Sequence, residues 1–260
     1  MDLDPDLAAL RPLGPFFALR TPPGSPGGPA AALPSLALAY GETPGSAAPG
    51  VHADPLAFRV RKVTRALRAP EERIGASVAQ QGLAARLWSV TLGCAVLYGS
   101  VPDLAPGLLR WDPDAAAPDD LWLTEVRARP GDAATVAATV LDGHLEPLSA
   151  ALRARHRVAP GLLRGNSGSA LAGAARQLDL WARTHGRPDV AARARGLTAE
   201  LFTHPLLADT GTLLTDTRTS AGTAFRRRSC CLYYRVPGGG VCGDCCFTRP
   251  PRSSPRAPSG

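Results

Sequence analysis

Five of the six cysteines of this 260-residue chain lie in one stretch, "CCLYYRVPGGGVCGDCC", at residues 230–246. Cys230 and Cys231 are adjacent, and Cys242 and Cys245 complete the spacing C-C-x10-C-x2-C. The glycine in "CGDC" permits a tight bend that turns both thiolates toward one metal. The "PGGG" turn predicts a hairpin-like excursion that brings the two cysteine pairs together. The spacing therefore predicts one four-thiolate site.

Four thiolates suit either a zinc ion or an iron–sulfur cluster. Structural zinc sites usually place about two to four residues between paired cysteines, whereas Cys230 and Cys231 have none between them. Neighbouring side chains of an extended strand point to opposite faces, so this pair needs a bent backbone or a target broader than one ion. A [2Fe–2S] cluster is broader. The spacing favours this cluster, and zinc and a disulfide pair remain alternatives.

The end of the chain that carries the cysteines is basic. Residues 226–260 contain seven arginines and one acid, Asp244, and so hold most of the net charge of +7. Arg226, Arg227 and Arg228 stand just before the first cysteine pair. They are candidate substrate-binding residues, because their charge can attract an anionic chelate or raise the potential of the cluster. A solvent-exposed basic run that pairs with acids of the body is the structural alternative.

Two tyrosines, Tyr233 and Tyr234, lie between the two cysteine pairs. Their rings can stack on a ligand or hydrogen-bond to a cluster sulfur, so they are further candidate substrate-binding residues. We favour the structural alternative, in which one of them packs into the core beneath the hairpin. The sixth cysteine, Cys94, lies in an apolar helical stripe and is predicted to be a buried core residue.

Helical periodicity dominates the elements that must position this segment. Apolar residues recur at helical spacing over four stretches, which are 71–95, 132–152, 166–181 and 190–201. Asn166 or Ser167 is expected to cap the third of these helices. The stretch "LWLTEV" (121–126) predicts a strand. The patterns predict an α+β fold, with a mainly helical body, a few short strands and a C-terminal cysteine-rich hairpin that holds an iron–sulfur cluster.

Composition divides the chain into four parts. We expect a Pro/Gly/Ala-rich N-terminal segment (1–56), a helix-rich body (57–215), a cluster-binding segment (216–249) and a disordered tail (250–260).

The sequence shows no targeting segment. The acidic start, "MDLDPDLAAL", lacks the positive charge of a secretory signal, and the longest apolar run, residues 87–99, is too short to span a bilayer. We therefore expect a cytoplasmic protein without a membrane span, where clustered cysteines are metal ligands more often than disulfides. His144 lies beside an apolar stripe and is predicted to be structural. No Walker or dinucleotide-binding pattern is present.

The stretch "RRRSCCLYYRVPGGGVCGDC" resembles the C-terminal signature of the ferric siderophore reductase family, the FhuF-like iron–sulfur proteins. The four cysteines of the spacing given above match that signature, whereas Cys246 departs from it. The stretches "ASVAQQGLAARLWSV", "LYGSVPDL", "LRGNSGSALAGAARQL" and "LTAELFTHPLLADTGTL" also resemble the family, so the resemblance covers most of residues 57–249. It implies that the four motif cysteines hold a [2Fe–2S] cluster. We prefer Cys245 to Cys246 as the fourth ligand, because Cys245 completes the CxxC knuckle.

The resemblance also implies a function. The family reduces Fe(III) bound to a siderophore, usually a hydroxamate, by one electron in the cytoplasm. The chain has no flavin or nicotinamide motif, so we expect an external donor, a ferredoxin or flavoprotein, and no nucleic-acid partner. One alternative is a four-cysteine zinc-binding module whose basic tail contacts nucleic acid. Another is a relative of siderophore-assembly enzymes, which needs an ATP site that the sequence does not show.

Overall fold

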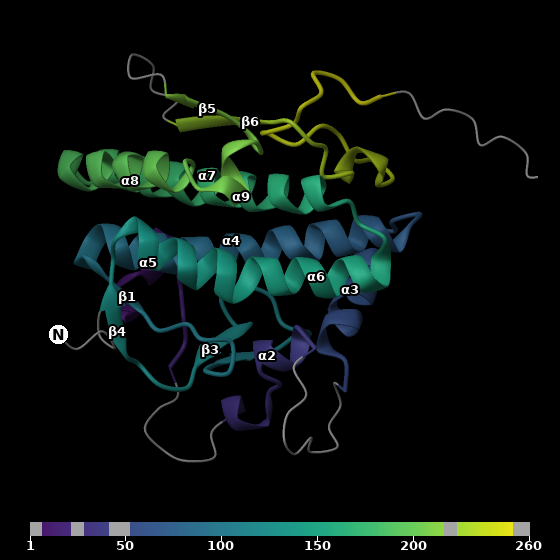
Figure 1. Ribbon diagram of the computed structural model, residues 1–260, viewed down its shortest axis with the longest axis horizontal. Helices are drawn as coiled ribbons and strands as arrows, with labels where there is room; N and C mark the ends of the chain where they lie inside the picture. The colour runs from purple at the N-terminus through teal and green to yellow at the C-terminus, as the bar shows by residue number, and fades with distance from the viewer. Residues whose placement is uncertain (1–6, 22–28, 42–52, 216–222, 252–260) are drawn as a thin grey trace, which may run out of the picture.

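The computed structural model describes residues 7–21, 29–41, 53–215 and 223–251 (Figure 1). Two long helices, α4 (Glu72–Tyr98) and α7 (Pro160–Thr184), pack against each other at the centre of the molecule. In Figure 1 the layer that contains α7 lies above the layer that contains α4. The interface between these two helices is the part of the fold that supports the cysteine segment.

The remaining helices flank this central pair. In the layer of α7 lie α8 (Pro188–Leu201) and the short α9 (Pro205–Ala208) (Figure 1). The layer of α4 includes α6 (Glu146–His156), and α3 (Pro55–Ala66) also packs on α4. The helices predicted from the apolar stripes that begin near Glu71 and Val190 are thereby confirmed. No helix in the described ranges is both long enough and apolar enough to cross a membrane.

The start predicted for α7 is wrong. The helix begins at Pro160, a residue favoured in the first turn, and not at a cap formed by Asn166 or Ser167. Both residues lie inside the helix and are buried. The small residues around them let other segments approach closely, because a Cβ on Gly165 would collide with Ser229. The polar stretch "GNSGS" is therefore a buried contact surface.

The helix predicted from Asp132 onward is confirmed, although its geometry is not uniform. Asp132 caps α5 (Ala133–Ala137) by accepting the Thr135 backbone N–H at 2.8 Å. A π-helical stretch, η3 (Ala138–Leu145), then leads into α6. Wide turns of this kind shift the register of the side chains along a helix.

His144, in η3, has the structural role that the sequence predicts. It is fully buried, and its ring nitrogens lie 2.6 Å from the Leu104 carbonyl and 2.8 Å from the Tyr40 hydroxyl. Burial lowers the pKa of His144 to about 4, so this ring is neutral near pH 7.

The described strands form three antiparallel pairs of two strands each. The first two pairs are β1 (Ser100–Pro102) with β4 (Ala128–Pro130) and β2 (Leu109–Trp111) with β3 (Leu121–Leu123). The third is β5 (Gly211–Thr215) with β6 (Thr223–Arg227). The strand predicted at 121–126 is confirmed only over its first half. Short strands beside dominant helices confirm the α+β class.

The described parts of the N-terminal segment are packed on the body. They contain η1 (Arg11–Leu13), η2 (Pro29–Ala32) and α2 (Leu36–Ala39). A buried arginine, Arg86, holds the stretch after η1 by donating hydrogen bonds to the carbonyls of Phe16 and Ala18, and it also pairs with Asp120 at 2.9 Å. Most of the predicted tail, residues 252–260, lies outside the described residues.

Candidate iron–sulfur site

The cysteine segment follows directly from β6 and lies beside the central helices (Figure 1). The segment has two arms, a first arm that carries Cys230 and Cys231 and a second arm that carries Cys242, Cys245 and Cys246. The arms are joined where the Arg227 backbone N–H donates to the Asp244 carbonyl at 2.9 Å. The second arm contains the predicted tight bend, in which the Cys245 backbone N–H donates to the Cys242 carbonyl at 3.0 Å. The two cysteine pairs are thus brought close together, as the spacing predicts.

The chain between the two pairs makes the hairpin-like excursion that the sequence predicts, although it contains no strands. It reverses through a single 3-10 turn, η4 (Tyr233–Arg235), and a glycine turn without strand pairing. Gly239 donates its backbone N–H to the Val236 carbonyl at 2.8 Å, and a Cβ on this glycine would collide with the Tyr233 carbonyl. A strand ladder is impossible here because η4 turns the backbone away from the extended conformation.

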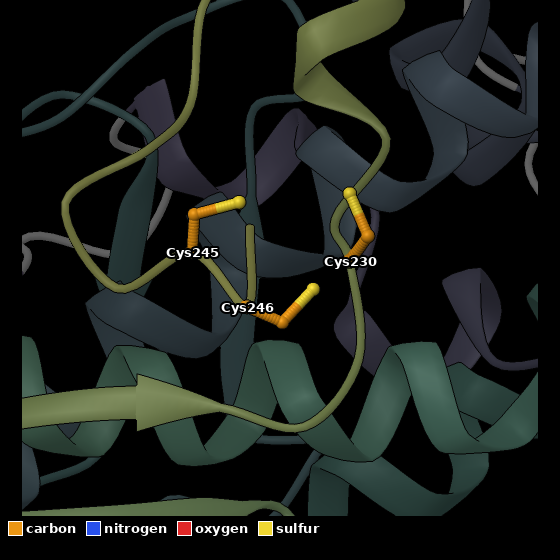
Figure 2. Close-up of side chains that lie close together, drawn as sticks. All are labelled: Cys230, Cys245 and Cys246. Carbon is orange, nitrogen blue, oxygen red and sulfur yellow. The ribbon is translucent and has the colours of Figure 1, made fainter. Parts of the chain in front are cut away.

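The sulfur atoms of all five cysteines gather at this reversal. The sulfurs of Cys230, Cys245 and Cys246 lie within 4.8 Å of one another, and Figure 2 shows them pointing into one shared space. The Cys231 sulfur, whose residue is only 3% exposed, lies 3.7 Å from the Cys242 sulfur. The sequence singled out four of these thiols. The structure also places Cys246 beside them, and the choice of four ligands stays a prediction.

Close contacts among the thiols shift their pKa values in opposite directions. Hydrogen bonds from Cys230 and then from Cys242 lower the pKa of Cys231. The same contacts with Cys231 raise the pKa of Cys230 and of Cys242 well above that of an ordinary thiol. Burial, followed by the charge of Cys245, raises the pKa of Cys246. A bound metal would favour the ionised form of its thiol ligands.

A buried polar network lies between the cysteine segment and the central helices. The Ser77 hydroxyl of α4 donates to the Cys231 carbonyl at 2.8 Å, and the Asn166 amide of α7 donates to the Ser77 carbonyl at 2.9 Å. The other end of the Asn166 side chain accepts a hydrogen bond from Arg227 at 2.6 Å. These side chains are all almost inaccessible to solvent. Sequence reasoning assigned none of them to the site except Arg227.

Arg227 is buried, unlike its two neighbours, and its predicted role in substrate binding stays a prediction. Arg227 is only 2% exposed, so its side chain does not face the solvent from which a substrate would arrive. Nε and Nη1 have no hydrogen-bond partner, and no carboxylate of the described residues lies within 4.0 Å of the guanidinium. Burying an unpaired charge is costly, so a negative group is needed nearby. A four-thiolate iron–sulfur cluster carries net negative charge, and the site fits such a group.

The neighbours of Arg227 lie at the surface. Arg226 is exposed, and Arg228 forms a solvent-exposed ion pair with Asp209 at 2.8 Å. Arg228 therefore follows the structural alternative of a solvated basic residue. A role of either residue in substrate binding stays a prediction.

Neither tyrosine packs into the core, so the interpretation that we favoured for them is wrong. Tyr233 is 38% exposed, and Tyr234 is half-buried with its ring edge-on to Phe247 at 5.8 Å. The turn itself lies against the body, where Arg235 pairs with Glu71 at 2.6 Å, but its tyrosine side chains are not buried. Cys94, in contrast, is fully buried, as predicted.

Asp244, between Cys242 and Cys245, anchors the second arm to α7. Its carboxylate accepts hydrogen bonds from Ser169 at 2.6 Å and from Arg176 at 3.0 Å. The same residue lines a cavity of about 430 Å³ that lies between the N-terminal segment, α4 and α7.

Comparison with known protein families identifies the cysteine segment. Residues 227–247 match the family model of the FhuF 2Fe-2S C-terminal domain, a match that covers the cysteine segment and none of the helical body. No curated protein matches the chain. The gathered thiols suit either metal, and the match to a 2Fe-2S domain favours the iron–sulfur cluster over zinc. Residues 227–247 of this chain are therefore similar to the FhuF 2Fe-2S C-terminal domain, and this similarity together with the cysteine group indicates a [2Fe–2S] cluster as the cofactor.

Proposed function

We propose that this chain is a ferric siderophore reductase. It takes one electron from an external donor, a reduced ferredoxin or flavoprotein, and passes it to Fe(III) in a siderophore of the hydroxamate type, so that Fe(II) is released in the cytoplasm. The observation that carries this proposal is the gathering of five cysteine sulfurs within the segment that matches the FhuF 2Fe-2S domain.

The proposed reaction needs electron transfer and no acid–base chemistry at the ligand. Hard oxygen ligands bind Fe(III) far more tightly than Fe(II), so the gain of one electron by the iron weakens the chelate and balances the oxidation of the donor. The bound [2Fe–2S] cluster supplies a one-electron centre of low potential. The polypeptide holds this centre near the surface, because Cys230, Cys242 and Cys245 are each partly exposed. Partial exposure supports both the entry and the exit of an electron.

We place the docking site of the ferric chelate in the cavity beside Asp244. Phe16 and Phe17 form apolar walls, and Gln81 and Gln177 offer neutral polar groups. Among the residues that the structure describes, the lining contains no lysine or arginine. A ferric ion saturated by hydroxamates is electrically neutral, whereas a ferric catecholate is strongly anionic and needs cationic side chains. The lining therefore favours the neutral class of chelate.

The first experiment measures the cofactor and the activity together. Anaerobically purified protein is expected to be red-brown, to contain equal amounts of iron and acid-labile sulfide, and to bleach with dithionite. The reduced protein is then mixed with a ferric hydroxamate, and Fe(II) is recorded with a ferrous-specific dye. Cluster-loaded protein that reoxidises no faster with the chelate than without it would contradict the proposed function and leave the cofactor unaffected.

A second experiment locates the docking site. Gly173 lines the cavity, and a Cβ added there meets no atom within 4 Å. Gly173→Trp is expected to lower kcat/KM for the ferric chelate by about tenfold or more, because the indole fills the cavity. The control is Gly196→Trp on the exposed face of α8, where added atoms also meet open space. Equal activity of the two variants would place the chelate elsewhere.

A further inference from the structure

Arg227 is a buried positive charge that forms no ion pair with the residues that the structure describes, and the acceptors of its guanidinium are neutral. Its Nη2 donates to Asn166 Oδ1 at 2.6 Å and to the Leu162 carbonyl at 3.3 Å. Both acceptors belong to α7 and carry no net charge. They orient the guanidinium without compensating its charge, and the cost of burying such a charge alone is several kcal/mol.

Arg227 is also attached to both parts of the cysteine segment. The Arg227 backbone bonds to Asp244, in the second arm, so the residue sits where the two arms meet. The guanidinium is linked to the first cysteine pair as well, because Asn166, which accepts from it, donates to the Ser77 carbonyl at 2.9 Å, and the Ser77 hydroxyl donates to the Cys231 carbonyl at 2.8 Å. The unpartnered Nε and Nη1 atoms are therefore available to a negative group held by these sulfurs.

We infer that Arg227 is the fixed counter-charge of the [2Fe–2S] cluster and raises its reduction potential. One-electron reduction adds one negative charge to the cluster, so a buried cation beside it stabilises the reduced state more than the oxidised state. Water does not screen Arg227, since the residue is 2% exposed. The inference depends on the cofactor and is independent of which substrate receives the electron.

The neighbouring arginine offers a matched control. Arg228 carries the same charge one residue further along the chain, but it is exposed and paired with Asp209. Solvent and salt screen such a charge, so its removal has little effect on the cluster. If the glutamine variants at 227 and 228 change the reduction potential by different amounts, the difference comes from the burial of the charge at 227, because both variants remove one positive charge from the segment.

The test is an anaerobic optical redox titration of the cluster-loaded protein, repeated on Arg227→Lys, Arg227→Gln and Arg228→Gln. Arg227→Gln is expected to lower the equilibrium constant for reduction by about tenfold or more, which is about 59 mV for a one-electron couple. Arg227→Lys keeps the charge and is expected to fall between Arg227→Gln and the wild type, and Arg228→Gln is expected to change the constant by less than about twofold. Equal potentials for Arg227→Gln and the wild type would overturn the inference, and so would an equal shift in Arg228→Gln.

A second measurement covers the case in which Arg227→Gln does not load a cluster. In apo-protein the charge at residue 227 is uncompensated, so Arg227→Gln is expected to unfold in urea no more readily than Arg227→Lys. If apo Arg227→Gln is clearly less stable than apo Arg227→Lys, the charge serves the protein body and the inference is wrong. Neither measurement involves a siderophore, so the inference and the proposed function fail separately.

Discussion

Replacing Asn166 by alanine tests whether the polar layer between the two central helices is as interdependent as its contacts indicate. The asparagine amide donates to the Ser77 carbonyl at 2.9 Å and to the Ser77 hydroxyl at 3.1 Å, and its oxygen accepts from Arg227 at 2.6 Å. A neutral buried hydrogen bond contributes about 1 kcal/mol, and one to a charged group about 2 kcal/mol. Their loss is expected to lower the free energy of unfolding by about 4 kcal/mol.

This magnitude distinguishes a buried network from the helix cap that the sequence suggested. Loss of an N-terminal cap costs typically about 1 kcal/mol. The assay is urea unfolding of apo-protein followed by circular dichroism, with Thr184→Ala as control at the exposed end of α7. The control is expected to change stability by less than about 0.5 kcal/mol. An Asn166→Ala variant that loses only about 1 kcal/mol would refute the reasoning.

The remaining predictions concern the cluster ligands and a buried histidine. Cys231→Ser and Cys242→Ser are each expected to abolish the visible colour and the ferric reductase activity. Cys94→Ser, in the core, is expected to keep both. A colourless Cys94→Ser protein would show that the predicted ligand set is wrong. Cys246→Ser is expected to retain the cluster, as judged by iron and sulfide content, and loss of iron there would make Cys246 a ligand. Burial lowers the pKa of His144 to about 4, whereas its pKa in the unfolded chain is about 6.5. Between about pH 6.5 and about pH 4 the imidazole is therefore protonated in the unfolded state and neutral in the folded state. Stability should therefore fall by roughly 3 kcal/mol as pH drops from about 6.5 to about 4, and urea unfolding of His144→Gln across this window should show a smaller fall.

The sequence predicted the helices of the body and the meeting of the thiols, because both depend on local patterns. Apolar spacing alone defines α4, and the cysteine spacing alone limits how far apart the two pairs can lie. The role of Asn166 was missed for a physical reason. A polar residue near a helix start looks the same in sequence whether it caps the helix or is buried against partners on another element.

The burial of Arg227 had a signal that the sequence analysis did not use. Side chains alternate along a strand, so within β6 Phe225 and Arg227 share one face and Arg226 points to the other. Phe225 is buried, and the arginine two residues later is buried with it. Recognising 223–227 as a strand would have separated Arg227 from its two neighbours. Which neutral groups hold the guanidinium still depends on α7, and no local pattern specifies that contact.

The points at which the cysteine segment is attached to the body determine how the molecule can be divided. Cys231 is held by Ser77 on α4, and Asp244 is held by Ser169 and Arg176 on α7. A synthetic peptide of residues 227–247 would lack every one of these supports and would leave the Arg227 side chain in water. Excision of the matched region would therefore not yield a portable metal-binding module, and the smallest unit that can keep this cofactor intact includes both long helices.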